Sequence, residues 1–116
     1  MTDFFLRVDR PENRHTWRFL DSDADGADTM QTISIPHREW LSTATFDKVN
    51  EFAEKNPNAL PGELIEHIIS IEDPEAHKWI KANRKKMPLG ALKVMWDEFN
   101  SERGMSEGES AASSNS

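Results

Sequence analysis

The strongest constraint on the fold of this chain is a set of helix start and stop signals in residues 60–104. At the centre of this segment, Asp73 can accept a hydrogen bond from an unpaired backbone N–H, and Pro74 suits the first position of a helix. Glu75 then lies in the first turn, where a negative charge favours the positive end of the helix dipole. The junction therefore predicts that one helix ends before Asp73 and that the next begins at Pro74.

Apolar side chains recur at helical spacing in four segments. We expect helices over about residues 45–55, 61–70, 74–85 and 88–103, with Gly104 directly after the last one. The side chains expected on one face are Phe46, Val49, Phe52 and Ala53 in the first helix, Leu64, Ile65, Ile68 and Ile69 in the second, Ala76, Trp79, Ile80 and Asn83 in the third, and Leu89, Leu92, Met95, Trp96 and Phe99 in the fourth.

The N-terminal third of the chain has strand character. Residues 15–20 and 29–35 are rich in β-formers and partly alternate, while residues 4–8 form a shorter apolar run. Turn residues separate these runs, and Pro36 ends the last of them. We expect a small antiparallel hairpin or meander, which needs helices to cover it.

The expected fold is therefore mainly α, in the α+β class: a β-hairpin or meander followed by a bundle of about four short helices. We expect one domain over residues 1–104, with a β-rich part at 1–36 and a helical part at 37–104. Residues 105–116 are rich in serine and too poor in apolar side chains to repay the entropy of ordering, so we expect a disordered tail.

Charge and composition exclude several classes of function. The 116 residues carry 14 basic and 21 acidic side chains, a net charge of −7, which argues against nucleic-acid binding. The absence of cysteine excludes disulfides and thiolate chemistry and suits the cytoplasm. We find no signal peptide and no apolar run of roughly 20 residues, so we expect a soluble protein that does not bind membranes.

One loop has part of a calcium-binding pattern. Asp21, Asp23 and Asp25 alternate and Gly26 follows, as in the first half of an EF-hand loop. The twelfth position, which should be a bidentate glutamate, is Thr32, and strands rather than helices flank the loop. We expect an acidic, solvated loop, and calcium binding by the three aspartates is the alternative.

Other patterns give little support for catalysis. Glu63 and His67 share a helix face and His77 follows on the next helix, which resembles part of a metal site but lacks the paired histidines of known motifs. The chain has neither a nucleophile-elbow pattern nor a glycine-rich phosphate loop. We therefore expect no enzyme activity and no cofactor.

Two groups of residues could bind a protein partner. The basic run consists of Lys78, Lys81, Arg84, Lys85 and Lys86. These cations complement the C-terminal end of a helix dipole, and docking to an acidic partner is the functional alternative. Large apolar side chains in the last two helices should mostly form the core, but any that are exposed would be anchors for a partner. These are Trp79, Met95, Trp96 and Phe99.

Several stretches resemble tail assembly chaperones of long-tailed, siphovirus-type actinobacterial phages. The similarity rests on the helix ALKVMWDEF at 91–99, followed by the tail GESAASSNS at 108–116. Upstream, ISIP at 33–36 and ALPGELI at 59–65 are similar to the strand and second helix of that family. The abrupt serine-rich end suits the short product of the family, made without a translational frameshift.

This resemblance implies a function in assembly. Members of the family bind the long, hydrophobic tape measure protein in the host cytoplasm and keep it soluble while tail-tube subunits polymerise, and they are not part of the mature virion. The implied partners are the tape measure protein and, beyond it, the tail-tube subunit and a second copy of the chain. From the residues alone, a small acidic phage protein that regulates or inhibits a host protein by occupying its basic site is the alternative.

Overall fold

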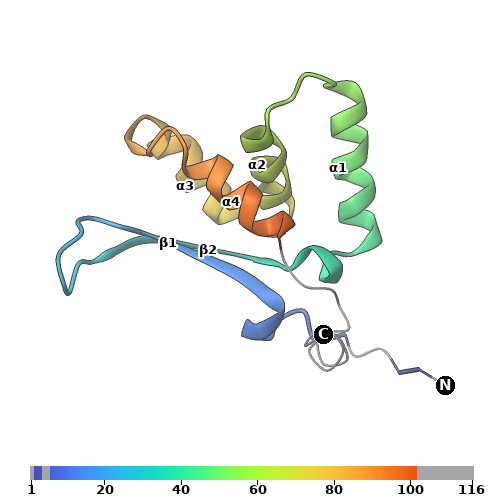
Figure 1. Cartoon of the computed structure of the whole chain (residues 1–116), viewed down its shortest axis with the longest axis horizontal. Coiled ribbons are helices and arrows are strands. Elements are labelled where there is room, and N and C mark those ends of the chain that lie inside the picture. The colour runs from blue at the N-terminus through green and yellow to red at the C-terminus, as the bar shows by residue number, and fades with distance from the viewer. Residues whose placement is uncertain (1, 4–5, 102–116) are drawn as a thin grey trace.

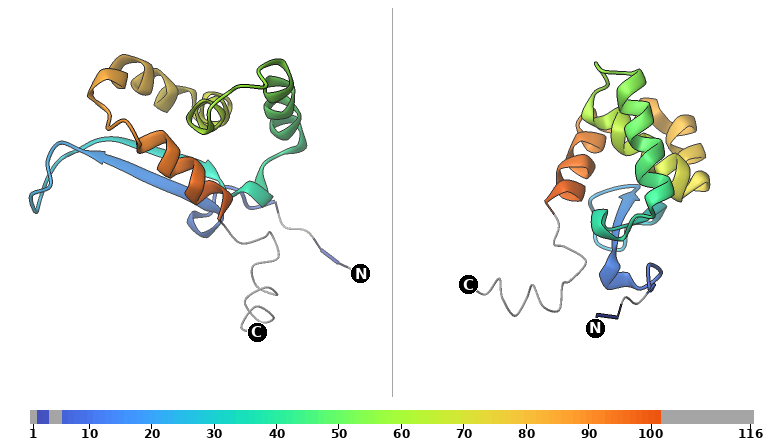
Figure 2. Two further views of the ribbon diagram at one scale, coloured as in Figure 1. Left: turned by 45° about the horizontal axis from the view of Figure 1, so that its top comes forward. Right: turned by 90° about the vertical axis from the view of Figure 1, so that its right-hand side faces the viewer.

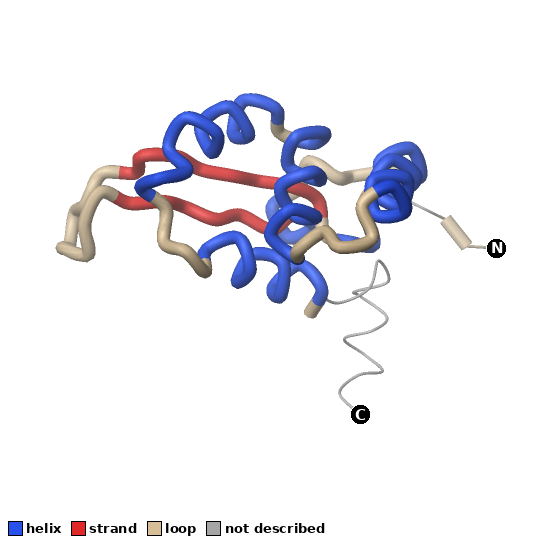
Figure 3. Tube along the Cα trace, turned by 90° about the horizontal axis from the view of Figure 1, so that it is seen from above, coloured by secondary structure: helices blue, strands red, loops and turns tan. Residues whose placement is uncertain are grey.

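The computed structural model describes residues 2–3 and 6–101. An antiparallel hairpin is followed by four α-helices, which confirms the predicted α+β class. Helices α2, α3 and α4 gather on one side of the hairpin, and α1 stands farther out beside α2 (Figures 1 and 2). Viewed from above, the two strands run side by side and end short of α1 (Figure 3).

The hairpin consists of β1 (Arg14–Leu20) and β2 (Thr29–Pro36). The strands pair antiparallel with Trp17 opposite Ile33, and the register shifts between Phe19 and Leu20. A short 3-10 turn, η1 (Pro11–Asn13), precedes β1. The apolar run at 4–8, which could have extended the hairpin into a meander, forms no strand at residues 6–8, and residues 4–5 lie outside the described part of the chain.

The strands are joined by an acidic loop that its own backbone closes. The Asp21 N–H donates to the Asp28 carbonyl (3.0 Å), and the Asp28 N–H donates to Asp21 Oδ1 (3.2 Å). Gly26 has a φ of 81°, in the region that side chains other than glycine rarely adopt. Glycine at this position lets the chain reverse direction between the strands.

The core is made by one face each of β2, α2, α3 and α4. Isoleucine dominates it because β-branched side chains pack well on a pleated strand and against helices. The fully buried apolar residues are Ile33 and Ile35 from β2, Ile65, Ile68 and Ile69 from α2, Ala76 and Ile80 from α3, and Met95 and Phe99 from α4. Every one of them lies on a face that the sequence periodicity predicts to be apolar.

The predicted cap between the second and third helices is confirmed. Helix α2 (Pro61–Glu72) ends at Asp73, and α3 (Pro74–Asn83) begins immediately after it. Asp73 Oδ1 accepts from the Ala76 N–H at 3.3 Å, while Oδ2 accepts from the Ser34 N–H in β2 at 3.4 Å. One carboxylate therefore caps α3 and also ties it to the hairpin.

Helix α1 (Thr43–Lys55) follows a short 3-10 turn, η2 (Arg38–Trp40), and begins two residues before its predicted start. It begins there because Ser42 Oγ accepts from the Thr45 N–H at 3.1 Å and so caps the helix. Thr45 is the only buried residue of α1, and its hydroxyl donates to Glu72 Oε2 at 2.5 Å. Phe46, predicted on the buried face, is 49% exposed because α1 is covered on one side only.

The last two helices are shorter than predicted. Helix α3 ends at Asn83 and not at residue 85, because the chain tightens into a 3-10 turn, η3 (Arg84–Lys86). Helix α4 (Ala91–Asn100) starts three residues late, since Gly90 at its N-cap offers no side-chain cap and disfavours helix. Leu89 consequently points away from the core. The predicted end at residue 103, Gly104 and the tail lie outside the described residues.

Contacts between the first strand and the last helix close the structure. The Trp17 Nε1–H donates to Glu98 Oε1 at 2.7 Å across a sequence separation of 81 residues. Beside it, the rings of His15 and Phe99 lie 5.8 Å apart. The hairpin is therefore held by α4 as well as by α2 and α3.

Candidate functional site

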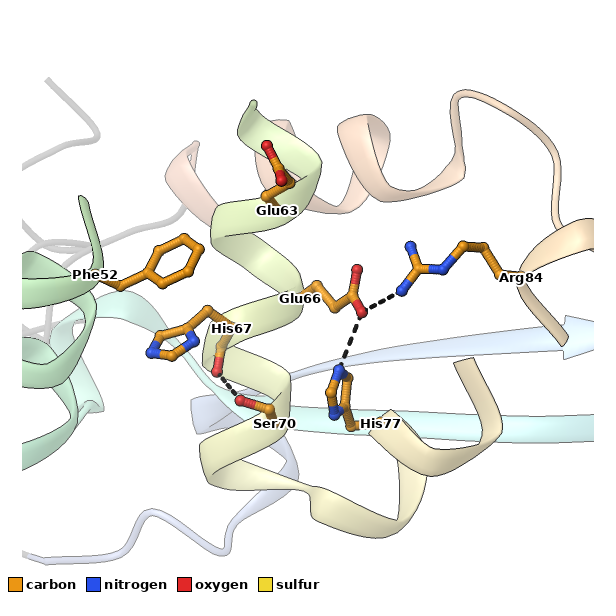
Figure 4. Close-up of a pocket in the computed structure, with 7 residues that line it drawn as sticks. All are labelled: Phe52, Glu63, Glu66, His67, Ser70, His77 and Arg84. Atoms are coloured by element: carbon orange, nitrogen blue, oxygen red, sulfur yellow. Dashed lines mark hydrogen bonds and ion pairs between the residues drawn. The ribbon is translucent and has the colours of Figure 1, made fainter. Parts of the chain in front are cut away.

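Helix α2 lies at the centre of the candidate site because its two faces have different chemistry. Its inner face supplies three fully buried isoleucines, which fix the helix over the hairpin. Its outer face carries Glu63, Glu66, His67 and Ser70, which line a pocket of about 380 Å³ together with Phe52, His77 and Arg84 (Figure 4). The 3.6-residue period of the helix places these polar side chains on the side away from the core.

Glu66 is the most constrained polar side chain of this pocket. Its Oε2 accepts from Arg84 at 2.5 Å and pairs with His77 Nε2 at 3.0 Å, and only 14% of the side chain is exposed. Burial raises the pKa of Glu66, but the hydrogen bonds and charges of Arg84 and His77 outweigh it and hold the pKa below its usual 4.5. Glu66 is therefore a carboxylate that joins α2 to the end of α3.

His67 lies on the opposite side of the pocket, against α1. Its ring stacks on Phe52 with centroids 4.3 Å apart and an angle of 14° between the planes. Burial lowers the pKa of His67 below 6.5, and the nearby charge of His77 lowers it further. Since the neutral ring is favoured, His67 behaves here mainly as an aromatic packing residue.

The arrangement of these side chains does not assemble a nucleophile and its base. The Ser70 hydroxyl donates to the His67 backbone carbonyl at 2.6 Å and not to an imidazole (Figure 4). Arg84 Nη2 and His77 Nε2 both contact the same oxygen of Glu66, so these two nitrogens are already engaged within the chain. Across residues 2–3 and 6–101, no three His, Asp or Glu side chains converge to hold a metal ion, the Asp21–Asp25 loop and the Glu63–His67–His77 group included.

A second, more apolar groove lies between the start of α2 and the start of α4. Its volume is about 350 Å³, and Leu60, Gly62, Leu89 and Leu92 form its apolar surface. Leu60 is 66% exposed and Leu89 fully exposed, and Gly62 lets α4 approach, because a Cβ there would lie 3.2 Å from that of Leu92. We call this feature the α2–α4 groove.

The charged side chains around the α2–α4 groove are all paired within the chain. They are Glu63, whose Oε1 accepts from the Leu60 N–H at 2.8 Å, Glu66, which binds Arg84, and Lys93, which pairs with Asp97 at 2.7 Å. The groove thus presents apolar surface to solvent without an unpartnered charge beside it.

The four apolar residues that the sequence suggests as partner anchors differ in how far they are buried in the structure. Met95 and Phe99 are 3% and 2% exposed, so both are core residues in this arrangement. Trp79 and Trp96 are partly buried and pack against the core. Leu60 and Leu89, whose exposure the sequence did not predict, are the exposed apolar residues of the α2–α4 groove. The sequence does hold a signal for this exposure. Leu60 directly precedes Pro61, and Leu89 lies between Pro88 and Gly90, so each lies where a helical face is interrupted.

The predicted basic run is exposed at the end of α3 and in η3. Arg84 is bound to Glu66, whereas Lys78 pairs only with the exposed Glu75 at 3.4 Å. Lys81, Lys85 and Lys86 have no ion pair with any described residue.

Comparison with known proteins identifies no relative: no protein-family profile, curated protein or solved structure matches the chain. In the part of the chain that the structure describes, each helix is too short or too polar to span a bilayer.

Proposed function

We propose that this protein is a phage tail assembly chaperone that binds an apolar segment of the tape measure protein in the α2–α4 groove, in the host cytoplasm. The observation that carries the proposal is the exposure of Leu60 and Leu89 over this groove. Small soluble proteins seldom leave large apolar side chains exposed beside a concave surface unless something binds there. The resemblance of residues 33–116 to this family supplies the identity of the client.

The chemistry of the groove favours an apolar client over a charged one. Because Glu63, Glu66 and Lys93 are already paired within the chain, a client gains little from placing charges beside them. An amphipathic helix can bind such a groove through apolar residues spaced three or four apart. The net charge of −7 would keep the complex soluble while the groove covers the client.

The test is co-expression of the chain with the tape measure protein, followed by pulldown and measurement of the soluble client. We expect the wild type to retain the client and raise its soluble fraction, with binding that persists from 50 to 500 mM salt. Leu60→Ser combined with Leu89→Ser should abolish both effects. Val94→Ser is the matched control, since Val94 is 53% exposed but does not line the groove.

Retention by the double variant equal to that of the wild type would exclude the groove as the binding site. Failure of the wild type to bind or solubilise the client would exclude the chaperone function itself. An acidic regulator that occupies a basic site on a host protein would then be the better proposal, and its binding should weaken steeply with salt.

A further inference from the structure

The end of α3 and η3 carry a dense group of exposed positive charges in this acidic protein. Four of its cations, Lys78, Lys81, Lys85 and Lys86, are exposed over the end of α3 and η3. Lys81, Lys85 and Lys86 have no ion pair with a described residue. We call these three residues the basic surface.

A complementary acidic surface lies in the hairpin loop. Asp21, Asp23, Asp25 and Asp28 are exposed within eight residues, and the loop reaches beyond the helices (Figures 1 and 2). Of these four aspartate side chains, only that of Asp21 accepts a hydrogen bond from within the loop, from the Asp28 N–H. Asp23 and Asp25 have no ion pair with a described residue.

The two charged surfaces lie at the same end of the molecule. Trp79 of α3 packs on Phe19 at the end of β1, with ring centroids 5.2 Å apart, two residues before the loop begins. From this contact α3 continues toward η3 while β1 continues into the loop, and the three views agree that both reach the same end (Figures 1, 2 and 3). We call it the hairpin end.

Exposed apolar side chains accompany the charges there. Leu20 and Met30 flank the acidic loop at 43% and 45% exposure. Surface ion pairs alone contribute little to association, so apolar area beside them is needed for a stable contact.

We propose that two copies of this chain bind each other through their hairpin ends. With both signs of charge on one end, a twofold axis places the acidic loop of each copy on the basic surface of the other, and the same contact forms twice. The occupant of the basic surface is therefore the Asp21–Asp28 loop of a second copy. This contact is independent of the α2–α4 groove function.

Substitutions that reverse the charge of one surface at a time test this arrangement. One variant combines Lys85→Glu with Lys86→Glu, and the other combines Asp23→Lys with Asp25→Lys. In sedimentation velocity at 50 mM salt we expect the wild type to dimerise and each variant alone to be monomeric, because one sign of charge then dominates its hairpin end and two copies repel each other. An equimolar mixture of the two variants should form a heterodimer, since their ends are complementary.

Two controls vary the salt concentration and the position of the substituted lysines. Raising salt from 50 to 500 mM should weaken the wild-type dimer by about tenfold or more, because exposed charges are screened. Lys48→Glu combined with Lys55→Glu, on exposed cations of α1, should leave dimerisation unchanged. Circular dichroism checks that each variant is folded.

Cross-linking gives an independent readout on the unmodified protein. A carbodiimide joins carboxylates to lysines in direct contact, and a mixture of ¹⁴N and ¹⁵N protein distinguishes links between copies from links within one. We expect links between copies from the loop aspartates to Lys81, Lys85 or Lys86.

A wild type that stays monomeric at 50 mM salt, or a variant mixture that does not associate, would overturn the proposal. Binding of a model polyanion such as heparin to the basic surface of a monomer would instead assign that surface to nucleic acid.

Discussion

Replacing Glu66 by glutamine should remove the strongest polar link between α2 and the end of α3. The substitution keeps the size of the side chain but removes the charge that accepts from Arg84 at 2.5 Å and pairs with His77 at 3.0 Å. Hydrogen bonds to charged groups contribute about 1.5–3 kcal/mol. Because 53% of the Arg84 side chain is exposed, solvent screening reduces this, and we expect a loss of about 1–2 kcal/mol in the free energy of unfolding at pH 7.

The effect should depend on pH in a direction set by the lowered pKa of Glu66. The folded-state pKa lies below the ordinary 4.5, so the unfolded chain takes up the proton first as pH falls. The stabilisation is therefore complete above pH 4.5 and is lost as pH decreases through the folded-state pKa. The difference between wild type and Glu66→Gln should be largest near pH 7 and should shrink toward pH 3.

Urea unfolding followed by tryptophan fluorescence measures these differences directly. In thermal unfolding at pH 7, the melting temperature of the variant should be lower than that of the wild type by roughly 4–8 °C for each kcal/mol lost. Glu51→Gln is the matched control, because its pair with Lys55 is long (3.9 Å) and exposed, and it should change stability by less than about 0.5 kcal/mol. A Glu66→Gln effect no larger than that of the control, or one that is unchanged at pH 3, would refute this reasoning.

Substitutions at three further residues address other parts of the fold. Asp73→Ala removes the cap on the Ala76 N–H and should cost about 0.5–2 kcal/mol, measured by urea unfolding, and Asp73→Asn should recover only part of it, because asparagine has one acceptor oxygen for the Ala76 and Ser34 N–H groups. Ile80→Ala leaves a cavity at a fully buried position and should cost about 2–5 kcal/mol; a loss below 1 kcal/mol would contradict the assigned core. The lowered pKa of His67 means that protonation favours the unfolded chain, so wild-type stability should decline as pH falls below 6.5. His67→Phe, which keeps an aromatic ring there, should decline less between pH 7.5 and 5.5 in thermal unfolding, and an identical pH profile would contradict the shift.

Local chemistry made the helix core and one cap predictable from sequence. The Asp73–Pro74 junction depends only on adjacent residues, and α3 begins at Pro74 as predicted, whereas α2 continues to Glu72, two residues beyond its predicted end at residue 70. Ile65, Ile68 and Ile69 were predictable for a related reason, since helical periodicity fixes which side chains share a face. The one-sided burial of α1 was not predictable, because Phe46 fits the apolar stripe and only the tertiary arrangement leaves it exposed.

The candidate sites depended on contacts that sequence spacing does not encode. Glu66 and Arg84 are 18 residues apart on different elements, so their pairing requires the angle between α2 and α3 to be known. The α2–α4 groove required the late start of α4 at Ala91, which changes Leu89 from a helix residue into an exposed turn residue. Helix ends are the least constrained part of a periodic pattern, and here the end of a helix forms the surface of interest.

The link from Trp17 to Glu98 has a consequence for how the chain is made. The ribosome synthesises β1 among the first residues, but the helix that holds it follows 81 residues later. A two-stranded hairpin is marginally stable alone, and contacts between distant parts of a chain form slowly. The part of β1 around Trp17 should therefore remain uncovered during translation until α4 emerges, so that completion of the last helix, and not of the hairpin, completes the fold.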